Sequence, residues 1–114
     1  MSQQIPGNQD VAVGGNDSLS VGGDRSVRIG RSSTVAVVAN QTVKVDKTLQ
    51  VDAKDLVLRG LDSLTLVCGA ASISLKKDGT VVIKGRDITI EGSGKLNAKA
   101  SGDVVLKGSK ILQN

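Results

Sequence analysis

The fold is decided by residues 11–45, which have the sequence VAVGGNDSLSVGGDRSVRIGRSSTVAVVANQTVKV. Apolar residues form pairs two positions apart there, and the pair recurs every eight residues. Because successive side chains of an extended strand alternate between its faces, both members of a pair lie on the same face. A spacing of eight is not a helical stripe, so each octad predicts one short strand. The pairs are Val11/Val13, Leu19/Val21, Val27/Ile29, Val35/Val37 and Val43/Val45.

Turn-forming residues separate the pairs, as in Gly14-Gly15-Asn16-Asp17 and Gly22-Gly23-Asp24-Arg25. Gly tolerates a positive φ, and Asn and Asp bond to their own backbone, so these segments predict corners between strands.

The pairs continue to the end of the sequence and predict thirteen strands in all. The interval departs from eight in places: we count six residues from Val45 to Val51 and nine from Leu66 to Leu75. Since the spacing within a pair survives, we expect the insertions and deletions to fall in corners. No window shows helical periodicity. The later pairs are Leu49/Val51, Leu56/Leu58, Leu64/Leu66, Ile73/Leu75, Val81/Ile83, Ile88/Ile90, Leu96/Ala98 and Val104/Leu106.

The composition favours an elongated all-β protein with a thin core. Phe, Tyr and Trp are absent from the 114 residues, and these are the side chains that bury the most area each. The net charge of +4 arises from interleaved charges without a basic run, and aromatic stacking residues are missing. We therefore expect no nucleic-acid binding. The single cysteine, Cys68, is expected to be a small core residue.

We expect residues 1–10 to form a flexible or transitional lead-in and residues 11–114 to form the repeat domain. The first residues have neither a basic region nor an apolar run, which predicts that there is no signal peptide. The chain is thus expected to be made in the cytoplasm and, if it leaves, to be carried by a dedicated machine.

We find no catalytic, cofactor or metal site in the sequence. His is absent, which excludes His-based acid–base catalysis, and one Cys excludes a Cys-rich zinc site. Asp17/Asp24 and Asp52/Asp55 could be taken for a glycosidase couple, but corners are where Asp is expected in any case. The Gly-rich segments are not followed by a helix, so they predict turns and not phosphate loops.

Short strands with two core side chains must pair with neighbours, and two arrangements provide them. One chain could wind into a solenoid with three octads per turn. Alternatively, identical chains could wind around a shared axis and pair with one another. The periodicity does not distinguish these arrangements.

The segment from Ser72 to Asn114, with its final Lys107-Gly108-Ser109-Lys110-Ile111, resembles the C-terminal end of VgrG proteins. These are the valine-glycine repeat spikes of the bacterial type VI secretion system, related to the membrane-puncturing needles of contractile-tail phages. Val13-Gly14-Gly15 and Val21-Gly22-Gly23 match the valine-glycine repeats of that family. The resemblance covers residues 11–114. It does not extend to the large N-terminal domains that whole family members carry.

The resemblance implies an intertwined triple-stranded β-helix, a triangular prism formed by a homotrimer. Thirteen strands per face would give a shaft at least about 60 Å long. The implied function is a non-enzymatic, cell-puncturing needle without a cofactor. It would be assembled in the bacterial cytoplasm and then secreted or injected, carrying effector proteins and touching the target membrane transiently.

The resemblance also implies that a PAAR-repeat tip protein binds the C-terminal residues. The alternative is a monomeric β-solenoid or a filament-forming scaffold. The implied tip-protein contacts are Lys107, Gly108, Ser109, Lys110, Ile111, Leu112, Gln113 and Asn114.

Overall fold

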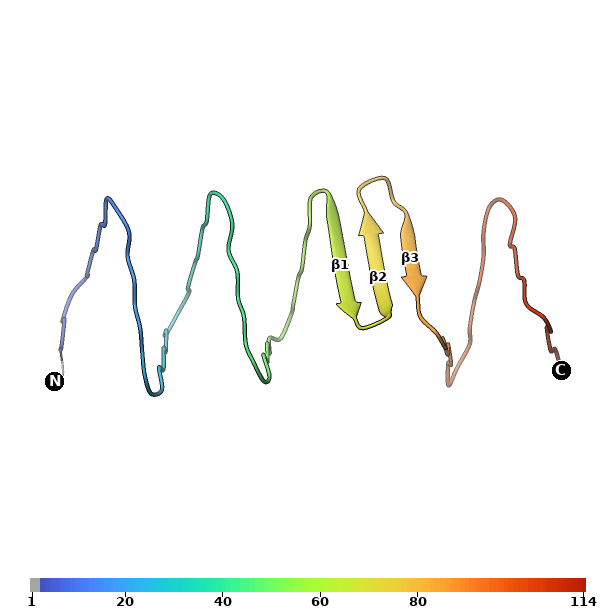
Figure 1. Ribbon diagram of the computed structural model, residues 1–114, viewed down its shortest axis with the longest axis horizontal. Coiled ribbons are helices and arrows are strands. Elements are labelled where there is room, and N and C mark those ends of the chain that lie inside the picture. The colour runs from blue at the N-terminus through green and yellow to red at the C-terminus, as the bar shows by residue number, and fades with distance from the viewer. Residues whose placement is uncertain (1–2) are drawn as a thin grey trace. The chain divides into compact units, whose positions relative to one another are not determined.

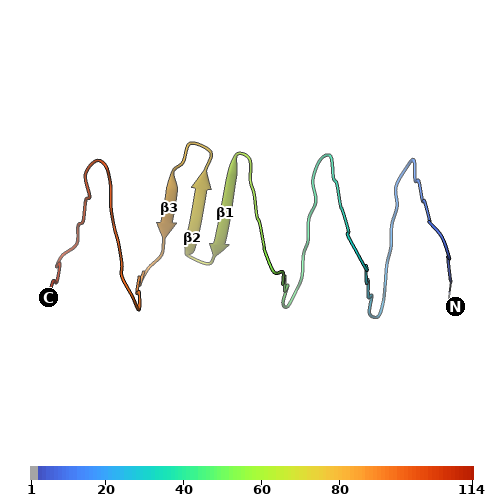
Figure 2. The same cartoon turned by 180° about the vertical axis from the view of Figure 1, so that it is seen from behind.

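The structure is a computed structural model that describes residues 3–114. Over these residues it is all-β and has no helix, which confirms the predicted class. Strand β1 spans Ser63–Cys68, β2 spans Ala71–Lys76 and β3 spans Val81–Lys84 (Figures 1 and 2). No helix in the described part is long and apolar enough to cross a membrane.

The chain divides into two units, Met1–Leu49 and Gln50–Asn114, and β1–β3 all lie in the second. The predicted division into residues 1–10 and 11–114 is a different one and stays a prediction. Residues 1 and 2 lie outside the described residues.

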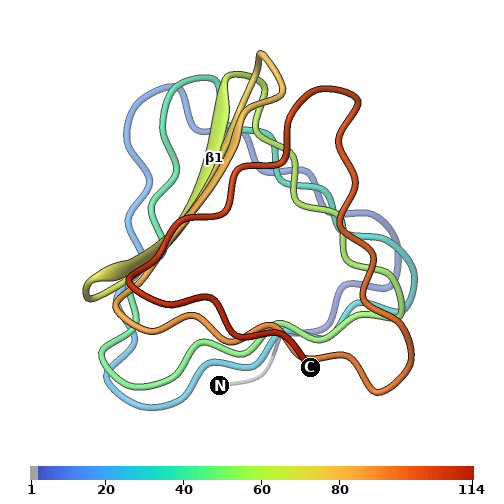
Figure 3. The same ribbon diagram turned by 90° about the vertical axis from the view of Figure 1, so that its right-hand side faces the viewer.

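In the first unit, extended stretches alternate with bends that recur every eight residues. The bends fall at residues 6–7, 14–15, 22–23, 30–31, 38–39 and 46–47. The octads are equivalent in exposure as well: Val11 and Val13 are 72% and 49% exposed, and Val43 and Val45 are 63% and 46% exposed. In Figure 3 the blue to green ribbon of this unit turns into a new direction at each bend. The octads therefore form strand-like stretches joined by direction-changing corners.

The predicted slip between Val45 and Val51 is wrong. The bends at residues 46–47 and 54–55 are still eight residues apart. Leu49, Val51 and Ala53 lie in the one extended stretch between these bends. The octad pair of that stretch is therefore Val51/Ala53, and Leu49 adds a third apolar residue on the same face.

The glycines of the early corners do not have the positive φ that the sequence analysis gave as a reason for them. Among the described residues, a positive φ occurs only at Gly69 and Gly79. A Cβ added at Gly14 or Gly22 would meet nothing within 4 Å in the single chain. Backbone strain therefore does not require glycine at these two corners.

Strands β1–β3 form an antiparallel sheet with β2 in the centre. Leu66 lies opposite Ile73, and Ile73 lies opposite Ile83. Because side chains alternate along each strand, the apolar pairs of all three strands share one face of the sheet. A sheet within one chain was not predicted, since we expected strands to pair between turns or between chains.

Two hairpin turns hold this sheet together, and each uses one positive-φ glycine. Gly69, at φ 55°, is the first residue of the two-residue turn between β1 and β2. Gly79, at φ 94°, ends the turn between β2 and β3, where its N–H donates to the Lys76 carbonyl at 3.0 Å. The Lys76 N–H donates to the Thr80 carbonyl at 2.9 Å. Both turns match loop types that suit the right-handed twist of hairpins.

The Lys77 N–H also donates to the Asp62 carbonyl, just before β1, at 3.1 Å; beyond this bond, the sheet and its turns, the described backbone makes no backbone–backbone hydrogen bonds. None of the described residues is buried. The chain exposes 12845 Å², whereas a folded monomer of its 11.7 kDa mass would expose about 5900 Å². One chain therefore does not supply its own core, and its strands and apolar pairs are open to partners.

Candidate functional site

The most distinctive surface is the apolar face of the sheet, which we call the sheet face. Its members are hydrophobic and none of them carries a charge. Ile73 and Leu75 of the central strand are still 39% and 38% exposed, although β1 and β3 flank them. The opposite side carries mainly Ser, Thr and Lys. The sheet face consists of Leu64, Leu66, Cys68, Ala71, Ile73, Leu75, Val81 and Ile83.

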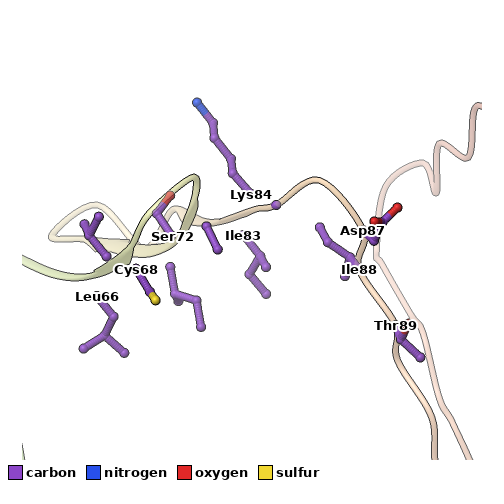
Figure 4. A pocket seen from close by; sticks show the side chains of 12 residues that line it. Leu66, Cys68, Ser72, Ile83, Lys84, Asp87, Ile88 and Thr89 are labelled. Carbon is purple, nitrogen blue, oxygen red and sulfur yellow. The ribbon is translucent and has the colours of Figure 1, made fainter.

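A groove of about 420 Å³ adjoins this face, between the strand ends and the segment that follows β3. Leu66, Cys68 and Ile83 extend to one side of the ribbon, and Lys84 extends to the other (Figure 4). Ile88, which follows the corner after β3, also lines the groove. The groove is an aliphatic surface without a charge cluster, which suits packing and not acid–base chemistry.

Cys68 lies at the end of β1, opposite Ala71, and its side chain is exposed in the single chain. The predicted core position is therefore not reached within one chain. Cys68 shares the sheet face with Leu64 and Leu66 and would be covered only if that face were covered.

Asp78 stabilises the turn between β2 and β3. Its Oδ1 accepts a hydrogen bond of 3.0 Å from the Thr80 N–H. Because this bond favours the charged carboxylate, it holds the pKa of Asp78 below its ordinary value. Asp78 thus has a structural role in the turn.

The other polar groups do not form a reaction centre. Asp52 accepts a hydrogen bond of 2.7 Å from Gln50 Nε2, two residues away. Arg86 Nε lies 3.8 Å from Asp87 Oδ2, and both side chains are almost fully exposed. Such an exposed ion pair contributes little to stability. The described part of the chain has no group of three or more His, Cys, Asp or Glu residues that could hold a metal ion.

The predicted tip contacts lie in two extended pieces, which a bend at Ser109 separates. A Cβ added at Gly108 would lie 3.3 Å from the Lys110 carbonyl oxygen, so this corner favours glycine. Ile111 and Leu112 are 59% and 90% exposed. These residues are therefore accessible.

Comparison with known proteins gives a partial match. The chain is 49% identical over 53 residues to the type VI secretion system spike protein VgrG1b of Pseudomonas aeruginosa. The chain is similar to a VgrG spike. The match covers 46% of this chain and only 7% of the VgrG1b protein. No protein-family model matches the chain.

The sheet face is the surface that the sequence analysis missed, although two signals for it are present. Gly69-Ala70 lies between two alternating runs, and Asp78-Gly79 is a strong short-range hairpin signal. Both segments separate apolar pairs as the corners of the first unit do, but they reverse the chain so that consecutive strands pair.

Proposed function

We propose that this chain forms part of the shaft of a type VI secretion spike. In this proposal three copies wind into an intertwined triple-stranded β-helix with the form of a triangular prism. The rod acts mechanically: a contracting sheath pushes it through a target envelope, and effector proteins travel with it. The similarity to VgrG1b supports the spike role.

One observation supports assembly of several chains, as the proposed trimer requires: the single chain buries none of its described residues and exposes more than twice the area of a folded monomer. Its octads have strand-like stretches whose backbone groups lack partners in the chain. Copies wound around a shared axis would provide both a core for the apolar pairs and partners for the backbone. Continuous pairing around a closed prism would also leave no lateral edge for aggregation.

The proposed role is structural and not enzymatic. It asks only for stiffness, since force along the axis would have to shear many paired strands together. The aliphatic sheet face and the repeated Val and Ile pairs fit packing at an axis, where side chains from three faces meet. The chain would assemble in the bacterial cytoplasm, be secreted or injected, and touch the target membrane transiently.

We further propose that residues 107–114 contact a PAAR-type tip protein, as the resemblance to VgrG proteins implies. Exposed Ile111 and Leu112 offer apolar area for such a contact. A pull-down with a purified PAAR-repeat protein tests it. Removal of residues 107–114 should abolish retention, whereas Lys84→Ala should retain the tip protein; equal retention by both variants would refute this contact.

Electron microscopy of the purified chain tests the shaft. The proposal expects discrete rods at least about 60 Å long, from thirteen extended stretches stacked at the spacing of paired strands. Filaments of variable length would support the scaffold alternative, and compact single-chain particles would support a monomeric solenoid. Either of these two outcomes would refute the trimeric shaft.

A further inference from the structure

The sheet β1–β3 is the part of the described chain that can become ordered before a second chain is present. Its strands pair within one chain, β1 with β2 and β2 with β3. Hairpins of this kind close in about 1–10 μs. The octads of the first unit find no backbone partner within their own chain. The sheet can therefore form its backbone bonds within one chain, whereas the octads need another chain for theirs.

The sheet also presents a surface that needs an aliphatic partner. All eight residues of the sheet face are apolar, and Lys76 and Lys84 lie on the opposite side. An uncharged face cannot satisfy a charged or strongly polar partner, because the partner's groups would lose water without gaining hydrogen bonds. The same face of another copy meets this requirement.

The exposed area identifies the occupant as further copies of this chain. Relative to a folded monomer of the same mass, the chain exposes about 7000 Å² in excess. A standard interface buries about 800 Å² on each partner, far less than this excess. A separate partner that docks on the sheet alone would leave the octads uncovered, whereas copies of the chain cover both.

The octads alone do not fix the register, that is, the alignment of one chain along another. Their apolar pairs recur every eight residues, so a chain displaced by one octad again places apolar pairs beside apolar pairs. The three-stranded sheet occurs once in the described residues, and its strands follow one another on one side in Figure 3. A displaced chain would leave part of this face uncovered.

We infer that the sheet β1–β3 nucleates assembly of the trimer and sets its register. Three sheet faces pack together first, and the octads then pair outward from that point. This inference rests on the proposed trimeric shaft, and it adds an order of events and a means of alignment. It predicts that equal truncations in the two regions affect assembly differently.

A matched pair of variants of the full chain tests the inference. Ile73→Ala removes three carbons from the centre of the sheet face, and Ile29→Ala removes the same atoms from an octad pair. Each variant is unfolded in guanidinium and diluted, and the trimer is followed by mass and by detergent resistance at several protein concentrations. Ile73→Ala should slow trimer formation about tenfold or more, because it weakens contacts already present in the transition state. Ile29→Ala should change that rate by less than about twofold and mainly speed dissociation.

Cys68 gives a second readout that remains useful if Ile73→Ala fails to assemble. Its thiol lies on the sheet face, so alkylation during refolding should stop when the sheets meet, before detergent resistance appears. Cys68→Ser removes the single thiol of the sequence and is the control for reagent specificity, since it should give no labelling. Equal slowing by the two isoleucine variants, or loss of alkylation only after detergent resistance, would overturn the inference while leaving the trimer intact. A wild-type chain that stays at 11.7 kDa would instead refute the trimeric shaft itself.

Discussion

The octads of residues 11–45 and the sheet of residues 63–84 have the same apolar pattern but form different structures. Both have pairs with a spacing of two and short polar corners. In the octads the corners turn the chain without positive φ and without backbone hydrogen bonds. In the sheet, positive-φ glycines at residues 69 and 79 reverse the chain, and consecutive strands pair.

This difference teaches that the corner, and not the apolar pattern, decides where a strand finds its partner. A tight reversal brings the next strand beside the previous one. A wider corner sends it away, and its backbone groups then have no backbone partner within the chain. The same apolar pattern thus forms an intrachain sheet in residues 63–84, and in the proposed shaft it contributes to an interchain one in the octads.

The largest expected effect on assembly comes from a charge placed in an apolar pair. It tests whether the pairs of the octads and of the sheet both face the interior. Val21→Asp in an octad and Ile83→Asp in β3 should each abolish trimer assembly, at a cost of at least about 3 kcal/mol per chain. Three carboxylates would otherwise be brought together near one axis without partners. Solution mass and heat stability measure the effect.

Lys84→Ala is the matched control, because Lys84 follows Ile83 and lies on the opposite side of the sheet. It should assemble and resist heat like the wild type. A normal heat-stable trimer from either Asp variant would show that the assignment of that side chain to the interior is wrong.

A smaller effect is expected at the corner before β1, and it sharpens the contrast between corners. A Cβ at Gly60 would overlap the Ser63 carbonyl group, so Gly60→Ala should destabilise the fold by about 1–3 kcal/mol per chain. Gly22→Ala has open space in the single chain and should cost much less. Thermal unfolding of the two variants measures the difference; a larger loss at Gly22 would show that a neighbouring chain packs against that corner.

The reversal between β2 and β3 should depend on Gly79. Its φ of 94° is unfavourable for L side chains, so Gly79→Ala should cost about 1 kcal/mol or more. Faster hydrogen exchange of the β2 and β3 amides, with little change in the octads, is the expected result. Unchanged protection in β2 and β3 would show that this turn does not hold the sheet together.

The smallest effect concerns acid. Since the folded-state pKa of Asp78 is lowered, the stability that it contributes is present above the ordinary carboxylate pKa. That stability is lost as pH falls through the lowered value. Asp78→Asn keeps an oxygen that can accept from the Thr80 N–H but removes the titration, so the stability of the variant should vary less with pH in this range. Identical acid profiles for wild type and variant would assign the dependence to other groups.

Much of the fold could be predicted from the sequence, because the spacing of two and the interval of eight depend on local backbone geometry. The all-β class and the corners at Gly14-Gly15 and Gly22-Gly23 agree with the structure. The sheet was missed because the spacing within an apolar pair is the same whether the next corner changes the direction of the chain or reverses it. The predicted slip between Val45 and Val51 was wrong because Leu49 adds a third apolar residue to its stretch. The pair was therefore assigned as Leu49/Val51, whereas the interval of eight places it at Val51/Ala53.

The predicted tip contacts of residues 107–114 came from resemblance alone. The residues themselves give no sequence signal for a binding site. They are exposed, extended and uncharged apart from Lys107 and Lys110. A contact made through backbone groups at strand ends, as proposed, would need no catalytic or metal-ligating residues in the sequence.

Sedimentation equilibrium of the purified chain is the most direct test of shared winding. Three chains of 11.7 kDa predict a single species of about 35 kDa that persists on dilution and resists detergent. A stable species of 11.7 kDa with its own closed turns, or an open series of larger masses, would contradict the account.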